Sequence, residues 1–135
     1  MKHERRVANR ISELRPLSAW ASDVARALGC PADKVDDANL CLTEAVSNII
    51  RHGHRDGAEH EIGVEILRGP SALVVRIEDD APAFDPLSAP VSEPASLDEA
   101  KPAGRGLLLI RRTADAMSYE RRDGMNRLTL EFALE

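Results

Sequence analysis

Aromatic side chains and cysteines are scarce in this sequence. Its 135 residues include one tryptophan, one tyrosine, two phenylalanines and two cysteines. So few aromatic rings argue against a platform on which nucleic-acid bases stack. The two thiols, Cys30 and Cys41, are too few for a disulfide framework and favour a reducing compartment.

Long apolar segments and an excess of basic residues are also missing. No uninterrupted apolar run approaches the length of a membrane span. The polar residues 1–6 do not lead into the apolar stretch of a signal peptide. The formal net charge of −5 argues against general electrostatic binding to nucleic acid. We therefore expect a cytoplasmic protein with no membrane partner and no direct nucleic-acid partner.

The composition is that of an ordinary globular domain. Hydrophobic residues make up 43% of the chain and charged residues 30%. A chain of 135 residues is long enough to bury a core without disulfides. We expect a single domain over residues 1–135, without an internal repeat.

The N-terminal segment predicts a short strand followed by a helix. Residues 4–9 give a weak strand signal. Ser12 is the expected N-cap of the helix, and Pro16 is expected near its start. An apolar stripe extends over residues 17–28, and Gly29 is expected to end the helix.

A second helix is predicted to begin after Pro31 and to end at Gly53, where glycine closes it in the usual C-terminal manner. Glu44, Asn48 and His52 recur every fourth residue along it and therefore form one narrow stripe. The other side of the helix is apolar and is expected to face the core. A carboxylate, a carboxamide and an imidazole beside a buried face indicate a functional site, although alone they would be an ordinary polar helix face.

Three later segments alternate apolar with other residues, which predicts strands with one buried face. They are residues 62–66, 73–77 and 128–134, and the turn at Asp123-Gly124 joins the last of them to a strand at 118–122. This order of helices and hairpins predicts an α+β fold. We expect a two-layer α/β sandwich whose mixed, largely antiparallel sheet has helices on one face.

A proline-rich segment, residues 81–103, separates the hairpins. So long a connection in a compact domain is typical of a functional lid or of disorder. Residues 104–106, Gly-Arg-Gly, are then expected to open a third helix from Leu107 to about Met117. Glycines let a ligand approach the backbone, and the free N–H groups and dipole of a helix start favour an anion.

An acidic turn follows the second predicted strand, with Asp79 and Asp80 at its start and Phe84 and Asp85 within it. Taken alone, Asp79 is most simply a solvated acid or a cap, and a Gly-X-Gly is common. Together with the helix stripe, these segments describe a nucleotide site. An acid meets the base, an anion hole meets the phosphates, and a carboxamide or carboxylate holds Mg²⁺.

These segments resemble the ATP-binding motifs of the GHKL, or Bergerat-fold, ATPases, and more narrowly those of the anti-sigma regulatory factor or serine-protein kinase branch. Residues 44–53 are similar to the N box of that family, residues 79–86 to its first glycine box, and residues 104–110 to its second. Tyr119 and residues 123–130 also resemble the branch. The resemblance spans most of the chain. It implies the Bergerat ATP-binding fold, with a lid at approximately residues 81–103.

The resemblance also implies a role for each matching residue. Asn48 is implied as the Mg²⁺ ligand, Glu44 as the general base that activates the attacking hydroxyl or water, and Asp79 as the acceptor of the adenine amine. The other implied nucleotide-binding residues wall the pocket or lie near the phosphates: His52, Phe84, Gly104, Arg105, Gly106 and Leu107.

The implied activity is that of an ATP- and Mg²⁺-dependent serine/threonine-protein kinase. Its implied substrate is an STAS-type anti-anti-sigma protein, its second implied partner is a sigma factor, and members of the branch often form dimers. Ala81 and Ala103 stand where the family usually has glycine. Ala81 would carry strain of about 1 kcal/mol if it needed a positive φ. The alternative is therefore a catalytically weak or inactive module that acts by partner capture, and a stand-alone ATPase is a third hypothesis.

Other polar residues have simpler interpretations. The histidines within residues 52–60 lack the spacing of a zinc site and are expected to be solvated or to lie near phosphates. Cys41 is expected to be a small core residue. The arginine pairs at 111–112 and 121–122 are expected to be solvated charges or to contact an acidic partner.

Overall fold

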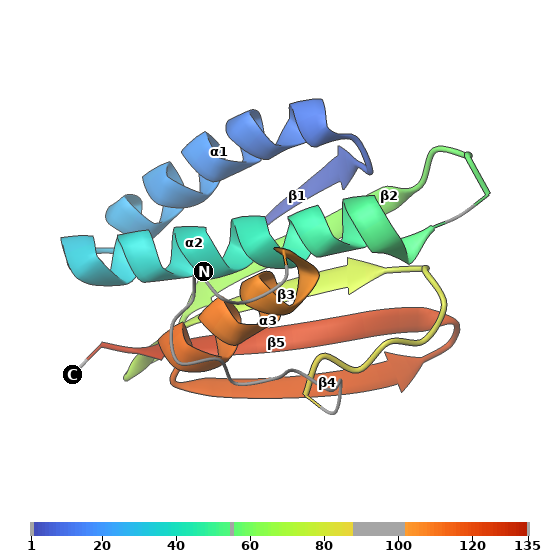
Figure 1. The fold of residues 1–135 in the computed structure, drawn as a ribbon. Coiled ribbons are helices and arrows are strands. Elements are labelled where there is room, and N and C mark those ends of the chain that lie inside the picture. Colours follow the sequence, from blue (N-terminus) through green and yellow to red (C-terminus); the bar gives the residue numbers. More distant parts are fainter. Residues whose placement is uncertain (1, 55, 88–101, 135) are drawn as a thin grey trace.

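The computed structural model of the chain describes residues 2–54, 56–87 and 102–134, and the backbone alone for residues 102–105. Within these residues, five strands form one sheet in the order β1-β2-β3-β5-β4, and each neighbouring pair is antiparallel (Figure 1). The strands are β1 (Lys2–Ala8), β2 (Glu61–Arg68), β3 (Ala72–Asp79), β4 (Ala116–Arg122) and β5 (Met125–Ala133).

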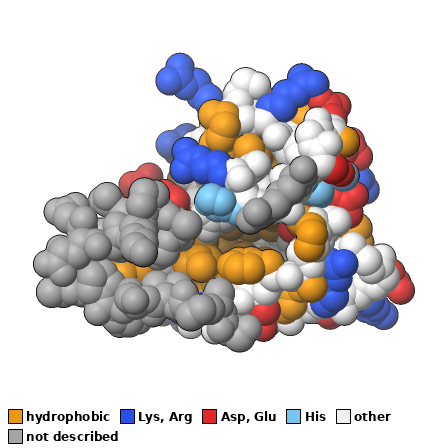
Figure 2. Space-filling model, turned by 45° about the vertical axis from the view of Figure 1, so that its right-hand side comes forward, with side chains coloured by type: hydrophobic (Ala, Val, Ile, Leu, Met, Phe, Trp, Pro, Cys, Tyr) orange, Lys and Arg blue, Asp and Glu red, His pale blue; other side chains and the backbone are white. Residues whose placement is uncertain are grey.

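The α-helices of the described residues lie over one face of this sheet (Figure 1), which confirms the expected α+β architecture. They are α1 (Leu14–Ala27), α2 (Ala32–Asn48) and α3 (Pro102–Thr113). A 3-10 turn, η1 (Ile11–Glu13), precedes α1, and a π-helical turn, η2 (Ile49–Gly53), extends α2. Helix α2 packs against both α1 and α3 and is therefore the centre of the helix layer. A face with a hollow between apolar and histidine side chains comes into view when the molecule is turned (Figure 2).

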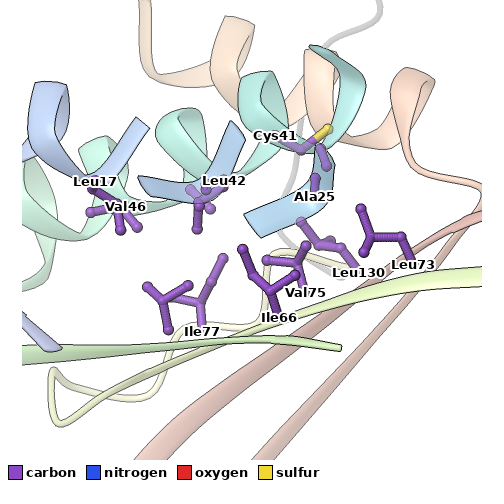
Figure 3. Packing of buried hydrophobic residues seen from close by; sticks show 14 of the residues in the cluster. Leu17, Ala25, Cys41, Leu42, Val46, Ile66, Leu73, Val75, Ile77 and Leu130 are labelled. Carbon is purple, nitrogen blue, oxygen red and sulfur yellow. The ribbon is translucent and has the colours of Figure 1, made fainter. Parts of the chain in front are cut away.

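The core lies between the helix layer and the sheet. Leu42 and Val46 of α2 are fully buried and point toward the sheet, where Ile77 of β3 is also buried (Figure 3). Burial of each side chain of this size stabilises the fold by about 1.5–3 kcal/mol. The prediction of strands with one buried face is confirmed for β2 and β3. Their inward-facing residues are all buried: Ile62, Val64, Ile66, Leu73, Val75 and Ile77.

Two polar residues occupy inward-facing positions at adjacent strand ends. Every second residue of β3 is buried, and Asp79 is the last of these residues. Asn126 is the first of the alternate, buried residues of β5. The two residues are partners in the β3–β5 ladder, and they are only 5% and 6% exposed. The sheet register therefore sets a carboxylate beside a carboxamide at one edge of the core.

The start of α1 differs from the prediction. Ser12 does not cap the helix but lies within η1, and α1 begins at Leu14 without a side-chain capping bond. The turn is closed instead by the backbone, because the N–H of Glu13 donates to the carbonyl of Arg10 at 2.9 Å. Pro16 lies in the first turn of α1, where its missing N–H costs no helical hydrogen bond.

The second helix ends at the predicted residue, but for a different reason than predicted. The helical path ends at Gly53 as predicted, but Gly53 lacks the positive φ of the expected glycine cap. A Cβ at position 53 would lie 3.2 Å from the Cβ of Ala81, which is closer than most side-chain contacts. Glycine is therefore favoured here because the acidic turn packs against the helix end.

The third helix was predicted too late in the chain. It runs from Pro102 to Thr113, so Gly106 lies within it and Met117 belongs to β4. Proline suits the first helical position because its φ is already helical. Among the helices of the described residues, none has the length and apolar character needed to span a membrane.

Candidate functional site

A pocket of about 470 Å³ lies between the C-terminal end of α2, the end of β3 with its following turn, α3 and β5. Apolar side chains form most of its wall, and Figure 2 shows apolar side chains around a hollow of the molecule. The larger apolar residues of the wall are Ile49, Ile77, Phe84, Leu107, Ile110 and Leu128. The polar side chains of the wall, within the described residues, are Asn48, His52, Asp79, Tyr119 and Asn126.

Asp79 is fixed in this wall by two hydrogen bonds to one carboxylate oxygen. Its Oδ1 accepts from the backbone N–H of Ala81 at 2.9 Å and from Nδ2 of Asn126 at 3.1 Å. Nδ2 of Asn126 also lies within hydrogen-bond distance of the carbonyl oxygens of Ala81 and Pro82, at 3.1 and 3.2 Å. The hydroxyl of Tyr119 donates to Oδ1 of Asn126. The carboxylate is therefore oriented by β5 and by the turn, and is not free to rotate.

Two arginines hold the turn that follows β3. Arg121 donates to the carbonyl of Ala81 at 2.7 Å, and Arg111 donates to the carbonyl of Pro86. Arg121 is exposed, as expected of a solvated charge, and Arg111 is partly buried, but both also hold the backbone of the turn, which the sequence did not predict. Ala81 itself is buried and does not have a positive φ, so the strain considered for alanine at this position is not present.

The polar stripe of α2 meets α3 at Gly106. A Cβ on Gly106 would lie 2.9 Å from Oε2 of Glu44 and 3.4–3.5 Å from the amide atoms of Asn48. The absence of a side chain lets α3 pack directly against the stripe. Glu44 and Asn48 are both partly buried, and Asn48 is part of the pocket wall. Glu44 thus lies beside the pocket, in contact range of the same glycine.

The remaining predicted site residues divide into two groups. His52 and Phe84 are exposed and Leu107 is buried, and all three line the pocket. The side-chain positions of Gly104 and Arg105 lie outside the described residues, as does the part of the predicted lid at residues 88–101. The backbone places Gly104 and Arg105 in the first turn of α3.

A second polar cluster lies next to the pocket. The side chains of His54 and His60 are only 7% and 19% exposed, so neither is freely solvated, and the alternative expectation of a position near phosphates stays a prediction. Nε2 of His54 lies 2.7 Å from Oδ1 of Asp80, and Nδ1 of His60 lies 3.2 Å from the same oxygen. The hydrogen bond from His54 is the main cause that lowers the pKa of Asp80, and the hydrogen bond to Asp56 is the main cause that raises the pKa of His60.

Cys41 is a core residue, as expected. It is fully buried, and this burial, reinforced by the negative charge of Asp37, raises the pKa of its thiol to about 12. The thiol is therefore protonated near neutral pH, and a reactive thiolate at this position is excluded.

Sequence reasoning did not predict the contacts that Asn126, Arg121 and the His54–His60 pair make in the structure. The sequence could have indicated the place of Asn126, because this polar residue lies on the same side of its strand as the inward-facing Leu128 and Leu130. No sequence pattern indicates the role of Arg121, because its acceptor is a backbone carbonyl 40 residues away in the chain. No sequence pattern indicates the histidine contacts either, because only the folded loop brings His54 and His60 to Asp80.

The sheet, the helix layer and the pocket define a class of protein. An antiparallel five-stranded sheet with helices on one face, and a pocket between that layer and two strand ends, is an α+β sandwich of the Bergerat type. Residues 7–132 match the model of the histidine kinase-like ATPase domain. The chain belongs to this family.

Several curated bacterial proteins are similar to the chain in sequence. Serine/threonine-protein kinase BtrW of Bordetella bronchiseptica is 40% identical over 94 residues, which cover 67% of this chain and 65% of that protein. Serine-protein kinase RsbW of Bacillus subtilis is 22% identical over 109 residues, which cover 77% of this chain and 68% of that protein. The chain thus spans about two thirds of the length of these relatives.

Solved structures share the fold. The structure of the RsbU and RsbW domains of Rv1364c from Mycobacterium tuberculosis matches 99% of this chain and 32% of its own, with a TM-score of 0.69 and 14% identity. The SiaB–SiaC complex from Pseudomonas aeruginosa matches 98% of this chain and 89% of its own, with a TM-score of 0.55 and 18% identity.

Proposed function

We propose that the protein binds ATP with Mg²⁺ and transfers the γ-phosphoryl group to a serine or threonine of an STAS-type anti-anti-sigma protein. The kinase names of the relatives support this proposal. The observation that carries it is the single pocket whose wall includes both Asn48 of α2 and Asp79 of β3. A sigma factor held by the same protein when the antagonist is absent completes the proposed partner switch.

The pocket suits an adenine ring. Ile77, Leu107 and Leu128 offer apolar surface to its faces, and Phe84 at the rim extends this wall. The two described hydrogen bonds to Asp79 both fall on Oδ1, which leaves Oδ2 to accept from an exocyclic amine. A buried carboxylate that is already oriented gives specificity at small entropic cost.

Phosphate binding is proposed at the junction of α2 and α3. The carboxamide oxygen of Asn48 is a hard ligand that suits Mg²⁺. The bound ion would offset the phosphate charge. Because α3 begins at Pro102, the N–H groups of Gly104 and Arg105 lie in its first turn, where they have no acceptor within the helix, and they favour an anion. His52 at the rim is proposed to contact the phosphates.

Glu44 is proposed as the general base. Its carboxylate lies beside Asn48 and against Gly106, next to the region proposed for the γ-phosphate. It would accept the proton of the partner's hydroxyl while that oxygen forms a bond to phosphorus and the bond to the ADP oxygen breaks. The carboxylate contributes through its position, because a base must reach the proton that it removes.

The proposal is tested with purified protein and ATP labelled in the γ-phosphoryl group. An STAS-domain protein from the same organism should become labelled in the presence of Mg²⁺. Glu44→Gln should retain nucleotide binding in calorimetry and lose labelling, whereas Asn48→Ala should lose Mg²⁺-dependent binding. If the wild type binds no adenine nucleotide in calorimetry, the proposal is wrong. Capture of the STAS protein without nucleotide and without labelling would instead establish the binding-module alternative.

A further inference from the structure

Four titratable side chains meet beside the proposed nucleotide pocket. His54, Asp56 and His60 lie in the segment between η2 and β2, and Asp80 follows the last residue of β3. Candidate ligand atoms of His54, His60 and Asp80 all lie within 4.8 Å of one another. A separate cavity opens against these residues and against Arg121. The proposed kinase reaction uses none of the four side chains.

The hydrogen bonds of His60 require an additional positive charge in this cluster. Its Nε2 lies 2.9 Å from Oδ2 of Asp56, and its Nδ1 lies 3.2 Å from Oδ1 of Asp80. A neutral imidazole has one N–H and one lone pair. One nitrogen of a neutral His60 would therefore set its lone pair against a carboxylate, unless a proton or a metal ion lies between them.

Protons alone compensate the two carboxylates incompletely. The rings of His54 and His60 are stacked, with centroids 3.6 Å apart and planes inclined by 8°. Two imidazolium cations at this distance would repel each other, so the stack holds at most one of them. A divalent cation supplies two charges and leaves both rings neutral, which is the form in which histidine binds metals.

The contacts of His60 also assign which of its two ring nitrogens donates a hydrogen bond. When Nε2 of His60 donates to Asp56, its Nδ1 presents a lone pair toward Asp80. A carboxylate behind a histidine in this way is the usual support of a metal-binding imidazole. Nε2 of His54 donates to Asp80 in the protein without a metal ion. Metal binding at Nε2 requires this proton to move to Nδ1, which is buried and without a hydrogen-bond partner among the described residues.

The distances suit a small transition-metal ion. Zinc bonds of about 2.0–2.1 Å in a tetrahedral site place neighbouring ligand atoms about 3.3 Å apart. The separation of 3.2 Å between Nδ1 of His60 and Oδ1 of Asp80 already has this value. The separation of 2.7 Å between Nε2 of His54 and the same oxygen is shorter, and because an imidazole lone pair lies in the plane of its ring, the two stacked rings bind one ion only after one of them rotates out of the parallel arrangement.

We propose that Nε2 of His54, Nδ1 of His60 and a carboxylate oxygen of Asp80 form a binding site for a divalent transition-metal ion of the Zn²⁺ class. Asp56 is its positioning residue, because it orients His60 and does not bind the ion. Two imidazoles with one carboxylate favour Zn²⁺ over Mg²⁺. The site is therefore distinct from the Mg²⁺ position proposed at Asn48. Three protein ligands leave a fourth position for a water molecule from the adjoining cavity.

The test is a titration of chelator-stripped protein with Co²⁺, without nucleotide. The wild type should bind one ion per chain with the visible absorption bands of tetrahedral Co²⁺, and Zn²⁺ should abolish these bands. Asp80→Asn and His60→Ala should lose this binding, and Asp56→Asn should weaken it by about 10- to 100-fold. His3→Ala, which removes a histidine far from the cluster on β1, should behave as the wild type.

A measurement on the wild type alone guards against variants that fail to fold. Long-range ¹H–¹⁵N spectra of the histidine rings, recorded with Zn²⁺, should show the ion at Nε2 of His54 and at Nδ1 of His60. The proposal is overturned if the wild type gives no tetrahedral Co²⁺ spectrum. It is equally overturned if Zn²⁺ perturbs only His3 or His52, or if folded Asp80→Asn and His60→Ala bind the ion as the wild type does.

Discussion

Asp79 and Asp80 are neighbours in the chain but belong to two different regions of the molecule. Asp79 is 5% exposed, faces the apolar pocket and is held by amide N–H donors. The side chain of Asp80 is 48% exposed, faces outward and is held by two imidazoles. Successive residues at a strand end point to opposite sides, so the two neighbouring acids face two surroundings of different chemistry.

The difference shows how the surroundings of a carboxylate select its role. The pocket around Asp79 offers apolar surface and amide groups, which suit a neutral heterocycle with an amine. The cluster around Asp80 offers nitrogen donors and a second carboxylate, Asp56, which suit a cation. Predictions that separate the two regions follow from these surroundings.

The largest expected effect is a loss of stability that disrupts both regions together. Leu42 is fully buried under the centre of the helix layer, so Leu42→Ala should lower the free energy of unfolding by about 2–5 kcal/mol. Leu40 lies on the same helix and is 38% exposed, so Leu40→Ala should change it by about 0.5 kcal/mol or less. Chemical denaturation measures both variants, and equal losses would show that α2 does not pack on the sheet as described.

The next effect, on nucleotide affinity, should distinguish Asp79 from Asp80. Asp79→Asn replaces a charged acceptor and should weaken adenine-nucleotide binding by about 1.5–3 kcal/mol, which is about 10- to 150-fold in Kd. Asp80→Asn in chelator-stripped protein should leave this Kd within about twofold, because its side chain faces away from the pocket. Calorimetry with ATP and Mg²⁺ measures both constants. Similar losses in the two variants would contradict the division of roles.

A smaller effect concerns the residues that orient Asp79. Asn126→Ala removes the donor to Oδ1 of Asp79 and the acceptor of the Tyr119 hydroxyl, so it should cost about 1–3 kcal/mol in stability and about tenfold in nucleotide affinity. Tyr119→Phe removes a single hydrogen bond to Asn126 and should cost about 1 kcal/mol in stability. Thermal unfolding and calorimetry give the two quantities. A nucleotide affinity unchanged in Asn126→Ala would show that Asp79 needs no such support.

The smallest effect on stability is expected at Gly106. The Cβ of Gly106→Ala would press against Oε2 of Glu44, the end of a flexible side chain that can move aside. Alanine favours the helix, so stability should be unchanged or higher by up to about 1 kcal/mol, while displacement of Glu44 should slow phosphoryl transfer by about tenfold.

Gly63→Ala is the matched control for that variant, because a Cβ on Gly63 meets no atom within 4 Å. Its rate of phosphoryl transfer should equal that of the wild type. Full activity in Gly106→Ala would argue against the position proposed for the base.

Much of the fold followed from periodicity, because one buried face per strand is a local property of the sequence. Residues 62–66 and 73–77 illustrate this, since every predicted inward position in them is buried. The start of α3 was missed because Pro102 lies at the end of a proline-rich segment without periodicity. The capping prediction for Ser12 failed because a backbone turn took the place of the side chain.

The candidate site was predictable where one element carries it and not where two elements must meet. Glu44 and Asn48 share a stripe that helical geometry alone defines. The bond between Asp79 and Asn126 depends on strand register, which no single strand encodes. The stacking of His54 on His60 depends on the path of a loop, so it too required the structure.

The central claim is that α2, the end of β3 and α3 form one nucleotide site. An amide NMR titration of the wild type with a non-hydrolysable ATP analogue and Mg²⁺ tests it most directly. The signals of Asn48, Ala81 and Gly106 should shift together and saturate with one common Kd. Shifts confined to a single one of these elements, or located on the outer face of the sheet, would contradict the account.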